Sequence, residues 1–349
     1  MWFVVVVALL LLMWWVARGQ DLSAFDQPAG EQFSTGAEPG EEHDAVVASL
    51  MVGAAELMHL PRRERLGKIR AYMDNMSAGR QFDASFTTVD AGGVPAEWVC
   101  ATGADSNRRV LYIHGGAYMM GSPVSHRVIT CRFSQVANAA VLAIDYRLMP
   151  EHSRLAGIED CRTAYRWLVD NGPQGSGAAT RVFVAGDSAG GNLTLSLIAW
   201  LRNQPLRQPD AAIALSPHTD STMSAPSIRN NVETDAMLAP MFSWLAKMPR
   251  PLLWWVNWAQ YRVCPASALV SPLLGELSGL PPTLVHASEA EMMLDDARRY
   301  VNRAVAAGSP AKLQTWEHVV HVWHMFDPDL TEARQAWGEI EKFIADLEC

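Results

Sequence analysis

The sequence predicts an α/β fold, in which a mostly parallel β-sheet is flanked by helices. Short apolar runs of strand length alternate along the chain with apolar residues at helical spacing, a pattern typical of βαβ units. Turn-forming glycines follow several of these runs. One stretch, residues 217–266, breaks the alternation with helical segments rich in proline, methionine and tryptophan. We interpret it as an insertion rather than as part of the sheet.

Composition limits the class of protein. The chain has 349 residues, of which 49% are hydrophobic and 19% charged, and its net charge is −9. It is too apolar to be disordered, is long enough to bury a sizeable core, and has no basic run that would favour nucleic-acid binding. The five cysteines are scattered and form no CxxC pair, so the sequence indicates neither a disulfide framework nor a zinc knuckle. We expect no cofactor and no metal.

The first seventeen residues are all apolar, and the first charge is Arg18. This length suits a membrane-spanning helix, and tryptophans near both edges suit the bilayer interfaces. We therefore expect residues 1–19 to be a membrane anchor of undetermined orientation. The pattern Ala17-Arg18-Gly19 also fits a signal-peptide cleavage site, which would give a secreted or periplasmic protein, and a buried core helix is a third alternative.

The remaining chain divides into five parts. Residues 20–43 are rich in Gly, Pro, Ser and acidic residues and predict a linker. Residues 44–80 show helical spacing and predict N-terminal helices, and residues 217–266 form the insertion. The core is expected in two parts, residues 81–216 and 267–349. Strands are predicted at residues 82–89, 95–101, 110–113, 140–145, 181–185, 211–215, 283–287 and 312–316.

The strongest motif is Gly186-Asp187-Ser188-Ala189-Gly190, between a predicted strand and a predicted helix. A serine on such a sharp turn exposes its Oγ above the sheet, and the turn is too crowded for large neighbours. The helix N-terminus favours a developing negative charge. Ser188 is therefore the candidate nucleophile, and the alternative is an ordinary glycine-rich turn.

A second motif, His114-Gly115-Gly116-Ala117-Tyr118, ends another predicted strand. Acyl transfer requires donors aimed at the oxyanion of the tetrahedral intermediate, and glycines let backbone N–H groups approach it closely. We expect the N–H groups of Gly115, Gly116 and Ala189 to form this oxyanion hole. The alternative is that the two glycines only make a tight turn.

Together these motifs resemble those of the hormone-sensitive-lipase-like, or family IV, α/β-hydrolase esterases. The similarity extends from about residue 44 to the C-terminus and, within the family, is nearest to bacterial esterases that include monoterpene lactone hydrolases. It implies an α/β-hydrolase fold with a helical cap, formed by residues 44–80 and the insertion at 217–266, and hydrolysis of carboxylic esters. The matching segments are HGGAY at 114–118, DYRLMPEH at 145–152, GDSAGGNL at 186–193, SPHTD at 216–220, the region 271–297 and WEHVVHVWHMF at 316–326.

The resemblance also implies the other two catalytic residues. It places the general base at His321, with His324 as the alternative, and the acid at Glu291, where the common family pattern has an aspartate. The order Ser188…Glu291…His321 fits the hydrolase order Ser…Asp/Glu…His. Asp295 or Asp296 are alternative acids, although as the first residues of a predicted helix they need only the helix dipole to explain them.

His318, His321 and His324 also form an HxxHxxH pattern, which raises a metal site as an alternative. On a helix the three would spread over too wide an arc for one site, and no HExxH motif accompanies them. We therefore interpret His318 and His324 as ordinary polar or packing residues.

The expected function is that of a serine carboxylesterase, which hydrolyses short- to medium-chain carboxylic esters through an acyl-enzyme. Its partner is a small-molecule ester, with membrane contact through residues 1–17. A lactone hydrolase or N-acyl deacylase with the same triad is the alternative, and a non-catalytic binding protein on the hydrolase fold is a remote one. Trp254, Trp255 and Trp258 at helical spacing predict a packed cap core, with pocket lining or bilayer contact as alternatives.

Overall fold

A computed structural model describes residues 19–28, 30–33 and 39–348, together with the isolated positions 2, 5 and 7. Most of the predicted anchor, residues 1–17, therefore lies outside the described residues. Within the described part of the chain, no helix is long and apolar enough to cross a membrane.

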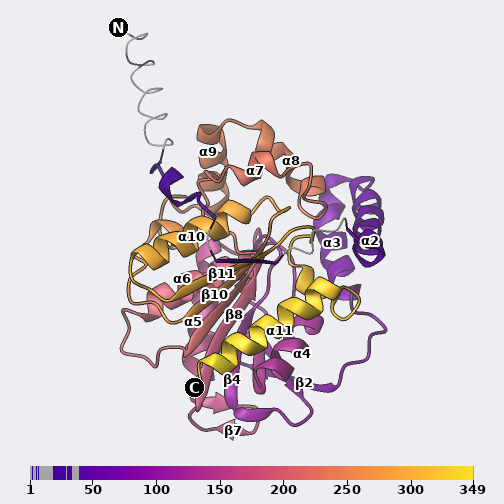
Figure 1. Ribbon diagram of the computed structural model, residues 1–349, viewed down its shortest axis with the longest axis vertical. Helices are drawn as coiled ribbons and strands as arrows, with labels where there is room; N and C mark the ends of the chain where they lie inside the picture. The colour runs from indigo at the N-terminus through magenta and orange to yellow at the C-terminus, as the bar shows by residue number, and fades with distance from the viewer. Residues whose placement is uncertain are drawn as a thin grey trace.

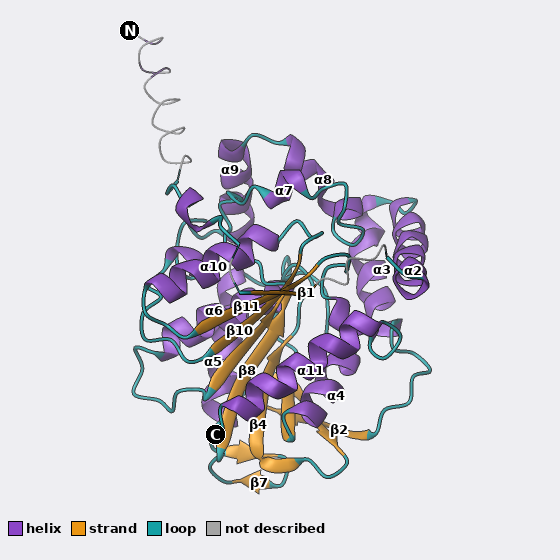
Figure 2. Cartoon of the chain, in the orientation of Figure 1, coloured by secondary structure: helices purple, strands orange, loops and turns teal. Residues whose placement is uncertain are grey.

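A nine-stranded sheet forms the centre of this described region, in the order β1-β11-β10-β9-β8-β4-β5-β3-β2 (Figures 1 and 2). All neighbouring strands are parallel except at one edge, where β3 is antiparallel to both β2 and β5. The strands are β1 (Glu31–Phe33), β2 (Ala84–Asp90), β3 (Pro95–Ala101), β4 (Asp105–Ile113), β5 (Ala139–Ile144), β8 (Arg181–Asp187), β9 (Ala211–Leu215), β10 (Thr283–Ser288) and β11 (Ala311–Trp316), and a separate hairpin pairs β6 (Asn171–Gly172) with β7 (Gly175–Ser176).

Helices cover both faces of the sheet. Buried apolar side chains of α5, α6 and α10 pack on one face, and those of α4 and α11 pack on the other. The helices are α2 (Glu41–Met58), α3 (Arg62–Asn75), α4 (Arg127–Val136), α5 (Arg154–Leu168), α6 (Ser188–Leu201), α7 (Ser227–Asn230), α8 (Ala239–Lys247), α9 (Arg250–Tyr261), α10 (Leu294–Ala306) and α11 (Thr331–Asp346), with 3₁₀ helices η1 (Ser23–Phe25), η2 (Pro272–Leu274) and η3 (Trp323–Phe326).

The cap lies beyond the carboxyl ends of the parallel strands. It combines the N-terminal helices α2 and α3 with α7, α8 and α9 from the segment predicted as an insertion (Figure 1). Buried side chains of the insertion, among them Leu245 and Leu253, form a small core with Met292 and Met293. The cap is thus packed against the turn that precedes α10.

The expectation that residues 20–43 form a linker is wrong for the described part of that segment. Leu22 is buried in the main core, and β1 pairs in parallel with β11 at the sheet edge. Phe33 stacks on Trp316 with ring centroids 4.5 Å apart. Gly30 has a φ of +79°, and a Cβ there would lie 1.8 Å from the backbone oxygen of Leu313, so only glycine fits this close approach.

Candidate active site

Ser188 lies at the junction of β8 and α6 with a φ of +51°, a left-handed conformation that is costly for a residue other than glycine. The turn is crowded: a Cβ on Gly190 would lie 1.9 Å from the backbone oxygen of Ile113, and one on Gly186 would lie 2.5 Å from that atom. Glycines at these two positions therefore let the strained turn pack against β4. This explains locally why the GxSxG sequence folds as it does.

A chain of hydrogen bonds joins Ser188, His321 and Glu291. His321 Nε2 lies 2.8 Å from Ser188 Oγ, and His321 Nδ1 lies 2.5 Å from Glu291 Oε2. Glu291 sits in the turn after β10 and His321 in the loop after β11, so the ends of three parallel strands bring the residues together. The structure therefore brings together the three residues that the sequence predicts.

The electrostatic surroundings of His321 favour the protonated form of its imidazole. His321 and Glu291 are both buried, and Glu291 Oε1 also accepts a hydrogen bond of 3.0 Å from the Ser288 N–H. Burial alone would lower the pKa of His321, but the charge and hydrogen bond of Glu291 outweigh it and hold that pKa above its ordinary value. An imidazole in this position can accept a proton from Ser188 and keep it beside a carboxylate.

The alternative histidines are engaged elsewhere. His324 is fully buried, and its Nε2 lies 3.0 Å from Nδ1 of His286. Burial, together with the neighbouring His286 and His321, holds the pKa of His324 well below its ordinary value, as expected for a neutral packing residue. The side chain of His318 is about half exposed and lies beside Glu317. No cluster of three or more metal-ligating side chains occurs among the residues that the structure describes.

The two alternative acids, Asp295 and Asp296, form hydrogen bonds with the segment that leads into the cap. Asp295 accepts a hydrogen bond of 2.8 Å from the Ser227 N–H. Asp296 accepts bonds of 2.7 Å from the N–H groups of Thr219 and Asp220. Both side-chain carboxyl groups thus hold backbone of the 217–230 region, whereas Glu291 is the one bonded to His321.

One predicted oxyanion donor is wrong. The N–H of Gly115 donates to Asp187 Oδ1 over 2.9 Å, so it is already engaged and is not available to an oxyanion. The next two residues, Gly116 and Ala117, line the cavity beside Ser188, and both have positive φ. Their N–H groups, with that of Ala189 at the start of α6, are the candidate donors. Gly115 instead allows close packing, since a Cβ there would lie 2.2 Å from Asp187 Oδ2.

Asp187, to which the sequence alone assigns no chemical role, supports the oxyanion loop of the site. Besides Gly115, its carboxylate accepts a 2.5 Å bond from the Tyr112 hydroxyl and lies 3.4 Å from His126 Nε2. Burial alone would raise the pKa of Asp187, but His126 and Tyr112 together hold it below its ordinary value. A buried charge beside the nucleophile thus fixes the loop that carries Gly116 and Ala117. An acid next to a nucleophile on a buried turn is itself a signal that such partners exist.

Above Ser188 and His321 lies a cavity of about 370 Å³. Its floor is formed by core residues and its walls by the cap helices. Its lining is predominantly apolar and unusually rich in methionine, which adapts to ligands of different shape. The apolar lining includes Leu50, Ile69, Tyr72, Met73, Met76, Met120, Met237, Leu238, Met241, Phe242, Val322 and Met325. Trp254, Trp255 and Trp258 are not among the described residues that line it.

Known proteins match this arrangement in sequence and fold. Residues 110–325 match the model of a protein family that is described as "alpha/beta hydrolase fold". An acetyl-hydrolase of Streptomyces hygroscopicus is 37% identical over 249 residues, which cover 71% of this chain and 78% of that one. The chain belongs to the hormone-sensitive-lipase-like family of α/β-hydrolase esterases.

Two further relatives agree with this membership. The carboxylesterase/phospholipase LipF of Mycobacterium tuberculosis is 35% identical over 268 residues, 74% of this chain and 69% of that protein. The crystal structure of an esterase from the bacterial hormone-sensitive lipase family superposes with a TM-score of 0.76 at 33% identity, covering 89% of this chain and 99% of that one. The family predicted from the motifs is therefore confirmed, and the protein is a hydrolase that acts on carboxylic ester bonds.

Proposed function

We propose that this esterase works through a covalent acyl-enzyme formed on Ser188. Ser188 Oγ attacks the ester carbonyl carbon while His321 Nε2 takes its proton, which gives a tetrahedral intermediate. His321 then returns that proton to the leaving alcohol, and the C–O bond to the alcohol breaks. In the second half, His321 deprotonates a water that attacks the acyl carbon, and the carboxylic acid leaves as Ser188 regains its proton. The hydrogen-bond chain from Glu291 through His321 to Ser188 is the observation that carries the proposal.

The negative charge of the intermediate needs donors in place before the reaction. We assign this task to the N–H groups of Gly116, Ala117 and Ala189, and the N-terminus of α6 adds its dipole. Asp187 supports the first two by holding Gly115. Glu291 keeps the proton of His321 on Nδ1 and stabilises the imidazolium that forms in each half-reaction.

The variant Ser188→Ala tests the mechanism. It removes the nucleophile without adding volume, so we expect turnover of p-nitrophenyl butyrate to fall by at least about 10⁴-fold with an unchanged melting temperature. Ser196→Ala is the matched control, because Ser196 lies on the same helix and its buried Oγ has no hydrogen bond within the described residues. Wild-type turnover by the Ser188 variant would refute the assignment.

For the substrate we propose esters of short- to medium-chain acids. A cavity of about 370 Å³ with apolar walls supports this range. In a series of p-nitrophenyl esters from two to sixteen acyl carbons, we expect kcat/KM to peak at eight carbons or fewer. A peak beyond twelve carbons would contradict the proposal, and faster turnover of lactones or N-acyl amides would favour the alternative activities.

For the cellular location we propose that residues 1–17 hold the enzyme on a membrane. The uninterrupted apolar run and the two edges rich in tryptophan support this. Carbonate extraction of membranes should leave the chain in the pellet, and mass spectrometry should find its N-terminus uncleaved. A chain that begins near residue 18 in the soluble fraction would refute the anchor in favour of a cleaved signal peptide.

A further inference from the structure

The two cap helices α8 and α9 carry an outer surface that the esterase reaction does not use. We define the outer cap face as Trp244, Lys247, Leu252, Trp258 and Arg262, none of which lines the cavity within the described residues. We propose that this face docks on the headgroups of an anionic lipid bilayer, and that the docking sets the enzyme with its cap toward the lipid. The proposal rests on the anchoring function proposed above for residues 1–17.

The outer cap face carries exposed apolar side chains. Trp244, Leu252 and Trp258 are 42%, 48% and 40% exposed, whereas Leu245 and Leu253, on the inner sides of the same helices, are buried. Tryptophan and leucine on one face of an amphipathic helix are typical of segments that lie in the bilayer interface. The outer cap face therefore has the apolar component that such docking requires.

The segment that forms the outer cap face is positively charged, unlike the chain as a whole. The whole chain contains 37 acidic residues among 349 and carries a net charge of −9, yet residues 236–275 contain no aspartate or glutamate. The same stretch contains Lys247, Arg250 and Arg262. Lys247 and Arg262 are exposed. A cationic and apolar surface on an otherwise acidic protein complements anionic lipid headgroups.

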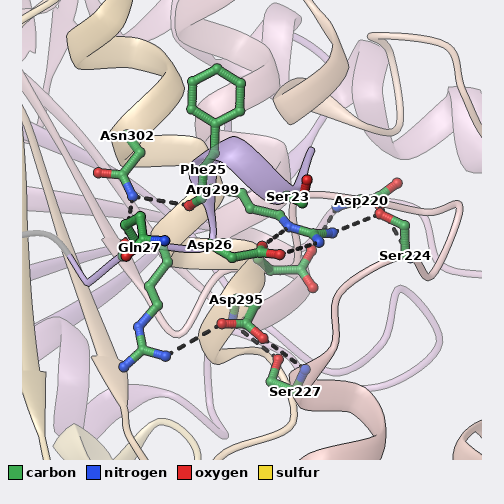
Figure 3. Close-up of polar contacts among 12 residues, drawn as sticks. Ser23, Phe25, Asp26, Gln27, Asp220, Ser224, Ser227, Asp295, Arg299 and Asn302 are labelled. Carbon is green, nitrogen blue, oxygen red and sulfur yellow. Dashed lines mark hydrogen bonds and ion pairs between the residues drawn. The ribbon is translucent and has the colours of Figure 1, made fainter. Parts of the chain in front are cut away.

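The segment that follows the apolar run is held against α10. Asp26 pairs with Arg299, and the Asn302 side chain donates to the backbone oxygens of Phe25 and Gln27 over 3.0 and 2.7 Å (Figure 3). Arg299 also donates to Ser224 Oγ over 2.8 Å, which ties the segment to the loop entering the cap. These contacts fix residues 25–27 relative to α10 and to the loop that enters the cap.

Gly19 is the first residue of the described segment 19–28, and it lies beside the start of α9. A Cβ on Gly19 would be 3.9 Å from Nη2 of Arg250. Only Arg18 separates Gly19 from the apolar run, and two residues span at most about 7 Å. A bilayer that holds residues 1–17 would therefore meet the molecule near the start of α9, the helix that carries Leu252 and Trp258.

This placement has a consequence for the substrate. Helix α8 contributes Met241 and Phe242 to the cavity wall, and it also carries the exposed Trp244, which does not line the cavity. One helix thus separates the cavity from the proposed lipid surface. Esters dissolved in the bilayer would then reach the cavity at a higher local concentration than they have in water.

Hydrogen–deuterium exchange on the full-length chain in lipid nanodiscs tests the docking. Discs of phosphatidylcholine alone are compared with discs that contain 30% phosphatidylglycerol. We expect peptides covering α8 and α9 to exchange at least threefold more slowly on the anionic discs, and peptides of α11 to exchange equally on both. Insertion of an uncharged apolar run does not depend on the lipid charge, so the anchor is the same in both samples.

Three variants sharpen the test. Trp244→Gln/Leu252→Gln/Trp258→Gln should lose the added protection on anionic discs. Lys247→Gln/Arg262→Asn should lose the dependence on phosphatidylglycerol by a change that leaves the apolar side chains in place, with Asn chosen because Arg262 has a φ of +55°. The matched control Leu155→Gln/Val305→Gln removes exposed apolar side chains from α5 and α10 and should behave as wild type.

The outcomes are distinguishable. Turnover of a water-soluble acetate ester shows that each variant is folded. Equal exchange of α8 and α9 on both kinds of disc, in wild type and variants alike, would overturn the docking while leaving the anchor intact. Slower exchange throughout the molecule, α11 included, would also overturn it, because it would indicate adsorption without a preferred face. A chain that leaves the discs would refute the anchor and, with it, this orientation.

Discussion

Replacing Glu291 by glutamine tests the electrostatic part of the mechanism. Glu291 Oε2 lies 2.5 Å from His321 Nδ1, and Oε1 is held by the Ser288 N–H at 3.0 Å. Glutamine keeps this shape but removes the charge, and it can present an N–H to Nδ1 and so favour the wrong tautomer. In serine hydrolases this loss is about 10⁴-fold in turnover, or about 5 kcal/mol of transition-state stabilisation.

The pH dependence gives a second and independent readout. In the wild type Glu291 raises the pKa of His321, and only the neutral imidazole can accept the proton of Ser188. Without the carboxylate, the pKa of His321 falls. The acid limb of the kcat/KM profile should therefore move to lower pH, while the plateau drops.

Glu291→Asp gives an intermediate case. Aspartate is shorter by one C–C bond, about 1.5 Å, so it keeps the charge but loses the direct contact unless the turn moves. We expect a loss of about 10- to 100-fold, well short of that for glutamine. Glu289→Gln is the matched control, because Glu289 pairs with Arg298 away from the hydrogen-bond chain.

The assay is steady-state hydrolysis of p-nitrophenyl butyrate between pH 5 and pH 9, with melting temperatures to confirm folding. Two results would refute the reasoning: a loss below tenfold for the glutamine variant, or an unshifted acid limb. Either would mean that Glu291 does not orient and charge His321.

Three further predictions follow from the same structure. Gly115→Ala places a Cβ 2.2 Å from Asp187 Oδ2 and should displace the oxyanion loop, lowering kcat by about 10²-fold or more; turnover within twofold of wild type would contradict it. Gly30→Ala, with φ +79° and a Cβ 1.8 Å from Leu313 O, should destabilise the β1 edge by about 1–3 kcal/mol, seen as a lower melting temperature, and an unchanged value would count against it. Burial and a neighbouring carboxylate raise the pKa of Asp296 to about 8, so the stabilising contribution of its neutral carboxyl is complete below the ordinary carboxyl pKa and is lost as pH rises through about 8. Asp296→Asn mimics the neutral acid and should flatten that decline in melting temperature between pH 5 and pH 9, whereas parallel pH profiles would contradict the assignment.

The central strands are predictable because they are buried on both faces. Residues 211–215 are a continuous apolar run, residues 283–287 are predominantly apolar, and the strands β9 and β10 begin at the predicted residues. β1 is not predictable in this way, since it has only three residues, Glu31–Phe33, within a segment of linker-like composition. Its position depends on one stacking contact and on a glycine that approaches another strand, both of which are tertiary features.

The oxyanion loop shows a different limit. The sequence indicates that glycines are needed after β4, but which N–H groups face the cavity depends on where Asp187 lies. Asp187 comes from another strand and takes the N–H of Gly115, so the available donors begin one residue later. Local sequence can predict a tight approach, whereas the partner of each N–H is set by packing between strands.

The choice among three acids is explained by how the cap joins the core. Glu291, Asp295 and Asp296 lie within one turn and the start of one helix. The cap residue Asp235 accepts from the Met292 N–H over 2.8 Å, and Asn231 Nδ2 donates to the backbone oxygen of Glu291 over 2.9 Å. The turn that positions Glu291, the proposed acid of the triad, is therefore held by the cap itself. A displacement of the cap would move Glu291 relative to His321, so the element that forms the cavity wall also determines the geometry of the proposed catalytic residues.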